Sequence, residues 1–296
     1  MTSQRISFHD EIARNKRKSV FLIVCVLAVL FLLVYVIGLA TGPDYFFMVL
    51  IFGTILSLVY VVGGFYNSDK LAVASAGAKK ADPVKYRMYY NIVEGLALAS
   101  GLKMPKLYII DNSQINAFAS GRDPGHAVVC VTRGAIEKLE KRELEGVIAH
   151  ELSHIANYDI RFMTLVAVLV GMISIISQIF LRSLFWGSLG GGGGRDKSKM
   201  IFMLIGIALA ILAPIVVMFV QLSISRKREY AADSSAVKFM RTPTGLIGAL
   251  EKIKSNRPLK VSGAIAPLFL ANPGKTKEMF MTHPPLEKRI EKLEKM

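Results

Sequence analysis

The sequence predicts an α+β membrane protein with four transmembrane helices and a cytoplasmic domain that contains a small β-sheet. Three observations support this fold class. The mean hydropathy is +0.43 and 52% of the residues are apolar, with the apolar residues concentrated in long uncharged runs rather than spread through a core. Three short strand patterns follow the second run. A helical pattern after them carries His-Glu-x-x-His at residues 150–154.

Four uncharged runs each reach the roughly 20 residues that cross about 30 Å of hydrocarbon as a helix. They cover residues 20–40, 45–66, 162–181 and 200–225. A buried core helix is the alternative for each run, and it weighs more for the last two. A cleavable signal peptide fits the first run poorly, because the run exceeds an h-region of about 7–15 residues and no small-x-small site follows it.

The basic residues predict the orientation in the membrane. Five of them precede the first run: Arg5, Arg14, Lys16, Arg17 and Lys18. The turn at 41–44 has none, so the positive-inside rule places the N-terminus and residues 67–161 in the cytoplasm, with a hairpin between them. Arg226, Lys227 and Arg228 place the C-terminal segment on the same side. The loop 182–199 is also basic, which blurs the rule for the second hairpin.

The net charge of +15 does not indicate a nucleic-acid partner. Such binding needs aromatic residues interleaved with Lys and Arg on a soluble face, and no segment has this pattern. Anionic lipid headgroups of the bilayer are the expected partner of the charge. The two cysteines, Cys25 in the first run and Cys130 in a predicted strand, form neither a disulfide framework nor a Cys-x-x-Cys zinc pattern. They indicate a reducing compartment.

The region between the second and third runs has the pattern of a small α+β domain. A linker of small residues spans 72–81. Asp82 as a cap and Pro83 in the first turn predict a helix that runs to Ala99 and is closed by Gly101. Strands are predicted at 106–111, 115–120 and 127–132.

A helix over 141–158 presents the motif His150-Glu151-Leu152-Ser153-His154. Spacing of i and i+4 puts both imidazoles on one face, within reach of one Zn²⁺ at about 2.0–2.1 Å. The Glu151 carboxylate between them is placed to act as a general base. No Ser, Thr or Asp precedes the helix, so the sequence does not fix where it begins.

A catalytic zinc has three protein ligands and one open position, so a third ligand is needed. Glu229 directly follows the fourth run. If the last two runs form a hairpin, Glu229 returns beside His150 and His154. The alternative is a carboxylate on a helix surface that pairs with Arg226 or Lys227. The residues alone support both interpretations about equally.

Four motifs in this order give the chain a resemblance to a known family. They are Asn116-Ala117-Phe118, His-Glu-x-x-His with Asn157 and Asp159, the segment Glu229-Tyr230-Ala231-Ala232-Asp233, and His283-Pro284-Pro285 with Arg289. With the four apolar runs they cover nearly the whole chain. The chain resembles the M48 family of membrane zinc metalloproteases, and within it the HtpX-type heat-shock proteases. The resemblance implies a zincin-like (gluzincin) domain and one zinc per chain, bound by His150, His154 and Glu229, with Glu151 as the base.

The same resemblance implies further roles for residues near the metal. His283 and Arg289 are expected to approach the site and stabilise a developing oxyanion, although His283-Pro284-Pro285 is also typical of a rigid turn. Asp233, one turn after Glu229, is expected to accept a hydrogen bond from the distal nitrogen of a zinc-bound histidine. Asp159 is the competing candidate for this task.

Asn116 and Phe118 lie on a predicted edge strand. Such a strand pairs with an extended substrate in many peptide-binding proteins. A purely structural strand is the alternative.

These inferences divide the chain into four parts. Residues 1–66 contain the cytoplasmic tail and the first hairpin, 67–161 the first catalytic part, 162–225 the second hairpin with a glycine-rich loop, and 226–296 the rest of the catalytic domain. By resemblance, the protein is expected in the bacterial inner membrane. It is expected there to cleave membrane proteins, particularly misfolded ones, as part of stress response and protein quality control.

Two other functions compete with this expectation. A CAAX prenyl endoprotease shares the same motifs, but four spans are few for the large chamber of its eukaryotic members. A transporter or scaffold with an incidental metal site would need polar residues within the spans. Apart from Gln178, Gln221 and a few hydroxyls, the spans contain almost none.

Overall fold

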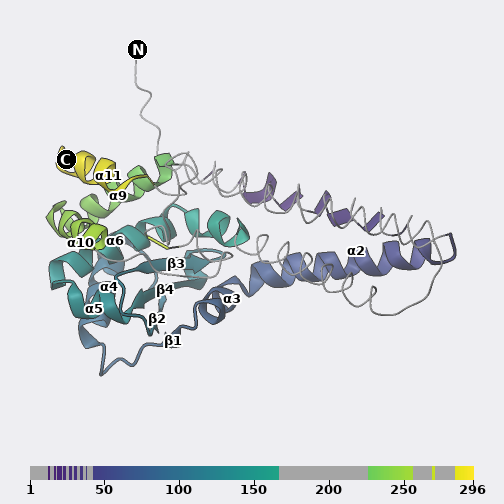
Figure 1. Cartoon of the computed structure of the whole chain (residues 1–296), viewed down its shortest axis with the longest axis horizontal. Coiled ribbons are helices and arrows are strands. Elements are labelled where there is room, and N and C mark those ends of the chain that lie inside the picture. Colours follow the sequence, from purple (N-terminus) through teal and green to yellow (C-terminus); the bar gives the residue numbers. More distant parts are fainter. Residues whose placement is uncertain are drawn as a thin grey trace, which may run out of the picture.

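The computed structural model describes residues 43–166, 226–255, 269–270 and 284–296, together with single positions between 13 and 38. In this part of the chain, helices surround a four-stranded sheet, and one long helix projects from the domain (Figure 1). The α+β class therefore agrees with the prediction. Most of the third and fourth apolar runs and the loop at 190–194 lie outside the described residues.

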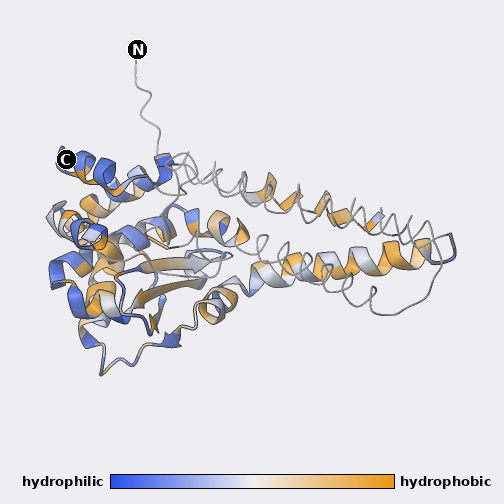
Figure 2. Ribbon diagram, viewed as in Figure 1, coloured by the Kyte–Doolittle hydropathy of each residue, from blue (hydrophilic) through white to orange (hydrophobic). Residues whose placement is uncertain are grey.

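Helix α2 (Pro43–Tyr66) has the length and composition of a membrane span. Its 24 residues include a window with a mean hydropathy of 2.4, of which 6% is buried. Figure 2 shows apolar residues along most of its length. At about 1.5 Å per residue, the helix exceeds the thickness of the hydrocarbon core. Within the described ranges it is the one helix that meets both criteria.

Residues of the first apolar run pack along α2. Leu30 and Val61 belong to one small buried cluster. A Cβ added to Gly53 would lie 2.6 Å from Cγ1 of Val34, so the absence of a side chain there permits close contact. Leu30 thus lies beside Val61, whereas Val34, later in the first run, lies beside Gly53, which comes earlier in α2. The two segments are therefore antiparallel, as the predicted hairpin requires.

The sheet has the strand order β1-β2-β4-β3. Its strands are β1 (Lys79–Lys80), β2 (Lys106–Ile110), β3 (Ala117–Gly121) and β4 (Ala127–Thr132). Strand β2 is parallel to β4, whereas β1 with β2 and β3 with β4 are antiparallel. The three predicted strands are thus present, and β3 lies at one edge of the sheet.

The predicted linker at 72–81 is not a linker. It contains the end of helix α3 (Ser68–Ser75) and strand β1. Ala72 is 5% exposed and packs with Phe118 and Cys130 on one face of the sheet. The small side chains here permit α3 to pack closely against the sheet. A flexible segment has a similar composition, so composition alone does not distinguish the two.

Among the described residues, six further helices belong to the domain, besides the helical segment at 159–166. They are α4 (Arg87–Ser100), α5 (Arg133–Lys138), α6 (Lys141–Ala156), α9 (Arg226–Met240), α10 (Thr244–Ser255) and α11 (Leu286–Leu293), with a 3₁₀ turn, η1 (Pro124–His126), before β4. Asp82 caps as predicted, accepting hydrogen bonds from the N–H groups of Val84 and Lys85. It caps a turn at 83–86, so the helix proper begins at Arg87. It ends at Gly101, whose φ of 69° is left-handed.

Helix α6 lies at the centre of the domain, in contact with α4, α9, α10 and β3. Each residue from Val147 to Ile155 is buried. Its first turn is held by a capping box, in which the Glu143 carboxylate accepts a hydrogen bond from the Glu140 N–H at 2.7 Å. Glutamate takes the capping role here, so the start of the helix lacks the Ser, Thr or Asp that usually marks it.

Candidate metal centre

Helix α6 directs two imidazoles toward one point. The Nε2 atoms of His150 and His154 are 3.2 Å apart, and the rings meet edge to face with centroids 4.7 Å apart. The residues are 1% and 4% exposed. Their spacing of one helical turn therefore has the consequence predicted from the motif.

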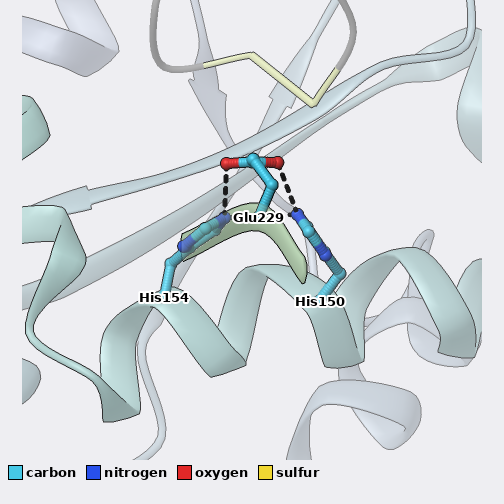
Figure 3. A group of neighbouring side chains, drawn as sticks. All are labelled: His150, His154 and Glu229. Carbon is cyan, nitrogen blue, oxygen red and sulfur yellow. Dashed lines mark hydrogen bonds and ion pairs between the residues drawn. The ribbon is translucent and has the colours of Figure 1, made fainter. Parts of the chain in front are cut away.

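Helix α9 brings Glu229 to the same point. Its two carboxylate oxygens lie 3.6 Å from Nε2 of His150 and 3.5 Å from Nε2 of His154, as the dashed lines in Figure 3 show. Glu229 is 1% exposed. The alternative of a surface carboxylate is therefore wrong, because packing of α9 across α6 buries this side chain against both imidazoles.

The distal nitrogen of each histidine meets an aspartate. His150 Nδ1 lies 2.9 Å from Oδ1 of Asp233, which is one helical turn after Glu229 on α9. His154 Nδ1 lies 3.2 Å from Oδ2 of Asp159. Asp233 and Asp159 were competing candidates for one task in the sequence, whereas in the structure each serves a different imidazole.

The position of Asp159 depends on how α6 ends. Tyr158 has a left-handed φ of 59°, which turns the chain directly after the helix. Residues 159–166 are again helical, and Thr164 of this segment shares a 2.9 Å hydrogen bond with the hydroxyl of Ser120 in β3. The turn thus returns Asp159 to His154 and connects the site to the start of the third apolar run.

The residues present fit a bound divalent metal. In the neutral form, with each Nδ1–H donated to its aspartate, each imidazole would present the lone pair of Nε2, and two such lone pairs 3.2 Å apart suit a cation between them. Tetrahedral zinc with bonds of about 2.0–2.1 Å places its ligand atoms about 3.3–3.4 Å apart. The three separations of 3.2, 3.5 and 3.6 Å match that geometry. Among the described residues, these three form the group that could hold a metal ion.

Arg289 of α11 reaches the site, as predicted, and is fully buried. Its Nε and Nη2 donate hydrogen bonds to the two oxygens of Asp233 at 3.0 and 2.6 Å. Its Nη1 is 3.7 Å from Glu229. The guanidinium therefore holds the aspartate that holds His150. His283, the other residue predicted to approach the site, lies outside the described residues.

These charges shift the pKa values at the site. Burial and the charge of Arg289 oppose protonation of His150, but Asp233 and Glu229 outweigh them, so that the pKa of His150 rises from 6.5 to about 9. Burial also works against ionisation of Asp233. The cations Arg289 and His150 overcome it and hold the pKa of Asp233 below its ordinary value.

Glu151 faces strand β3 from α6 and is 2% exposed. Burial raises its pKa above the ordinary value, while His150, His154 and a hydrogen bond from the Ala119 N–H act in the opposite direction. The carboxylate thus lies between the two imidazoles and the edge of the sheet. This is the position that a base requires if the substrate lies along β3.

Asn116 and Phe118 lie at that edge, with exposed fractions of 2% and 0%. The Asn116 side chain accepts a hydrogen bond from the N–H of Ala117 at 3.0 Å. The ring of Phe118 packs into a cluster on one face of the sheet. The backbone of Asn116 is bound to Thr132 on the side of β4, so the backbone that faces the edge of the sheet is that of Ala117, between Asn116 and Phe118.

One residue near the site was not recognised in the sequence. Arg228, taken there as a marker of membrane orientation, is 7% exposed. Its guanidinium lies 4.3 Å from the ring centroid of Phe162, and its Nη1 is 3.9 Å from Asp159. The position of Arg228 directly before Glu229 was the one feature of the sequence that could have indicated a place near the site. A cation that follows an apolar run is more often expected at the lipid surface.

Comparison with known proteins places the chain in a family, because residues 83–296 match Peptidase family M48. The chain belongs to this family. Its M48 relatives include the protease HtpX homolog of Caldanaerobacter subterraneus subsp. tengcongensis, 47% identical over 253 aligned positions that cover 83% of this chain and 84% of the relative. The HtpX homolog of Thermoanaerobacter pseudethanolicus is 42% identical over 99% of both chains. That of Listeria monocytogenes is 39% identical over 97% of this chain and 99% of its own.

A solved structure of similar fold is the crystal structure of S. mikatae Ste24p. It aligns with a TM-score of 0.51 at 18% identity, over 95% of this chain and 66% of that chain. At this identity the likeness supports the fold alone.

As an M48 peptidase with HtpX relatives, the protein is a membrane metalloprotease. The resemblance inferred from its motifs is confirmed, and a transporter or scaffold is excluded.

Proposed function

We propose that one Zn²⁺ per chain is bound by His150, His154 and Glu229, and that the protein uses it as an endopeptidase. The observation that carries this proposal is the convergence of the three ligand atoms within 3.2–3.6 Å, while the distal nitrogen of each imidazole meets a carboxylate. Two buried imidazoles and a buried carboxylate that converge on one point are a donor set typical of a catalytic zinc site.

Zinc bound there would supply Lewis acidity, which polarises the scissile carbonyl and acidifies water. Glu151 accepts the proton of the attacking water and later donates it to the amine that leaves. Its raised pKa assists the second step, because a carboxyl group that holds its proton more tightly remains protonated long enough to act as an acid. No covalent intermediate with the protein is needed.

Asp233 and Asp159 orient the two imidazoles, and Arg289 holds Asp233 in place. These interactions fix which nitrogen of each ring faces the metal. Stabilisation of the oxyanion by Arg289 and His283 stays a prediction. Arg289 has one terminal nitrogen, Nη1, that is not committed to Asp233 and is directed toward Glu229.

The substrate is proposed to bind as an extended segment on the edge of β3 that faces away from β4. The carbonyl of Ala117, between Asn116 and Phe118, faces this edge, and the N–H of Ala119 donates to Glu151 of α6. Backbone pairing of this kind accepts many sequences. Such tolerance suits a protease that removes misfolded membrane proteins, the substrates expected from its HtpX-type relatives.

We also propose four membrane spans, with the N-terminus and both catalytic parts, 67–161 and 226–296, in the cytoplasm of a bacterial cell. The apolar surface of α2 and its antiparallel partner support the first hairpin. The helix at 159–166 leads from Asp159 into the third run without an intervening loop. The metal centre is therefore expected near the inner surface of the bilayer, beside anionic lipids.

The test is zinc content and cleavage of casein by the full chain in detergent, with Glu151→Gln, Glu229→Gln and the exposed control Glu94→Gln. We expect Glu151→Gln to retain zinc and lose at least about a thousandfold in kcat, and Glu229→Gln to lose both zinc and cleavage. The control should match the unmodified protein. Full cleavage by Glu151→Gln would contradict the proposal.

A further inference from the structure

The edge of β3 is already occupied by two residues of the chain itself. Leu270 donates a backbone hydrogen bond to the carbonyl of Ala117 at 3.0 Å. The ring of Phe269 lies 5.0 Å from the ring of Phe118, at an angle of 63°. Both residues are 1% exposed. In Figure 1 they are the short yellow-green stretch of trace beside β3.

The carbonyl of Leu270 is also bound, from the side of the metal centre. Nη1 of Arg289 donates to it at 3.5 Å, and the same nitrogen is 3.7 Å from Glu229. Leu270 is thus bound through its N–H to the sheet edge and through its C=O to a cation at the site. An extended peptide on an edge strand makes this kind of pair of backbone contacts.

The two side chains lie on opposite faces of the sheet. Phe269 packs in the cluster that contains Phe118 and Met163, whereas Leu270 packs in the main core with Leu152 of α6. Alternation of this kind is expected of a strand added to the sheet. It leaves Leu270 on the face that carries the proposed base, Glu151.

We propose that Phe269–Leu270 is an internal substrate mimic. The inference rests on the proposed function, since it assigns to these residues the place of a substrate on β3. A substrate must displace them, so the protein restrains its own activity. The substrates that do so most readily are extended segments with a large aliphatic residue in the place of Leu270, because that position is enclosed by apolar side chains of the core.

The expected effect follows from competition for one site. If the mimic occupies β3 for most of the time, the apparent affinity for substrate is reduced by the fraction of protein in which the edge is free. Removal of the mimic should therefore lower KM and leave kcat unchanged. A purely structural contact has the opposite signature, because its loss would lower kcat or the folded fraction.

The experiment compares the zinc-loaded full chain in detergent with the double variant Phe269→Ala/Leu270→Ala, using casein as the substrate. Leu98→Ala on α4 is the matched control, since Leu98 is 78% exposed. We expect KM to fall roughly tenfold in the double variant, with kcat within about twofold of the unmodified protein. The control should change neither. An unchanged or higher KM at normal zinc content would overturn the proposal.

A second measurement does not require the variant to fold. An octapeptide with the sequence of residues 266–273, Ala-Pro-Leu-Phe-Leu-Ala-Asn-Pro, should compete with casein on the unmodified protein, and the same peptide with Asp in the place of Leu270 should not. Equal inhibition by both peptides, or by neither, would overturn the mimic. Failure of the proposed function has a different signature, because casein cleavage would then be absent from the unmodified protein or unaffected by Glu151→Gln.

Discussion

At the scale of single residues, the two histidines of the proposed zinc site each contact an aspartate, and the two aspartates have different partners of their own. Asp233 is bound by two nitrogens of Arg289, the closer at 2.6 Å. Asp159 lies near Arg228, whose Nη1 is 3.9 Å from its Oδ1, and Arg228 is 7% exposed whereas Arg289 is fully buried. The two sides of the site are therefore expected to respond differently to the same substitution.

Replacement of each aspartate by asparagine tests this difference. Both Asp233→Asn and Asp159→Asn should weaken zinc binding by about 10- to 100-fold, because the imidazole loses the carboxylate that orients it. Asp233→Asn should also reduce the stability of the metal-free protein by about 3–5 kcal/mol, since it leaves the buried guanidinium of Arg289 without its main counter-charge.

Chelator competition measures the first effect, and thermal unfolding in detergent measures the second. Equal losses of stability in Asp233→Asn and Asp159→Asn would contradict the distinction between the two sides.

The pKa of His150 predicts a proton released on metal binding. In the metal-free protein, Asp233 and Glu229 raise this pKa to about 9 against the opposition of Arg289, so His150 carries a proton at pH 7.5 that zinc must displace. Titration calorimetry in buffers of different ionisation enthalpy should show about one proton released from this group at pH 7.5 and none at pH 10. A release that does not change with pH would contradict this assignment.

The raised pKa of His150 also makes the stability of the folded metal-free protein depend on pH. Because the folded pKa of His150 lies above the unfolded value of 6.5, protonation stabilises the folded metal-free protein. This contribution is fully present below pH 6.5 and is lost as the pH rises through about 9.

The sequence predicted the metal ligands and the base better than it predicted the residues that contact them. His150, Glu151 and His154 follow from helical spacing alone. Glu229 required either the assumption of a hairpin or the family resemblance. Which aspartate serves which imidazole depends on the left-handed Tyr158, a backbone feature with no glycine to signal it. Burial of Arg228 is a consequence of tertiary packing that residue type does not reveal.

At the scale of elements, the positions of His150 and His154 depend on how closely α10 packs against α6. Gly146 of α6 faces α10, where an added Cβ would lie 2.5 Å from the backbone nitrogen of Leu246. Gly245 of α10 makes the reciprocal approach to the carbonyl of Arg142. Two glycines therefore set the distance between these helices, and α6 presents the metal ligands on a backbone that α10 holds in place.

A methyl group at Gly146 should separate the two helices. We expect Gly146→Ala to reduce stability by about 1–3 kcal/mol through overpacking against backbone atoms, which cannot move aside as a flexible side chain would. Gly95→Ala on α4 is the matched control, because no atom lies within 4 Å of its added Cβ. The control should be stabilised by about 0.5–1 kcal/mol through helix propensity. Thermal unfolding measures both effects. If the unfolding temperature fell equally in both variants, or in neither, the result would argue against the close approach of α6 and α10.

Elements with a clear period or cap were predicted to within a few residues. Strands β2, β3 and β4 and the glycine that ends α4 are examples. The segment at 72–81 was assigned as a linker because alanine-rich sequence has no amphipathic period, whereas its burial under the sheet arises from contacts distant in sequence. The addition of Phe269–Leu270 to the edge of β3 had no signal in the sequence for the same reason.

At the scale of the whole molecule, one end of α2 lies beside the catalytic domain and the other projects far from it (Figure 1). The projecting helix is apolar and exposed along most of its surface, as expected of a helix that lipid surrounds. The two ends of α2 should therefore lie on opposite sides of the membrane.

Cysteine labelling in cells tests this orientation. In a Cys25→Ala/Cys130→Ala background, a membrane-impermeant maleimide should label Asp44→Cys in intact cells, because the turn before α2 is expected outside the cytoplasm. Val84→Cys, at an 87% exposed position in the domain, should be labelled only after the cells are made permeable. The reverse pattern would contradict the positive-inside assignment.

The central claim is that two imidazoles and one carboxylate jointly bind a single zinc, and X-ray absorption at the zinc edge of the purified full chain tests it most directly. The account predicts one zinc per chain with about four nitrogen and oxygen neighbours at about 2.0–2.1 Å and the scattering pattern of two imidazoles. In Glu229→Gln that signal should be lost. A sulfur neighbour, or an unchanged zinc spectrum and content in Glu229→Gln, would contradict it.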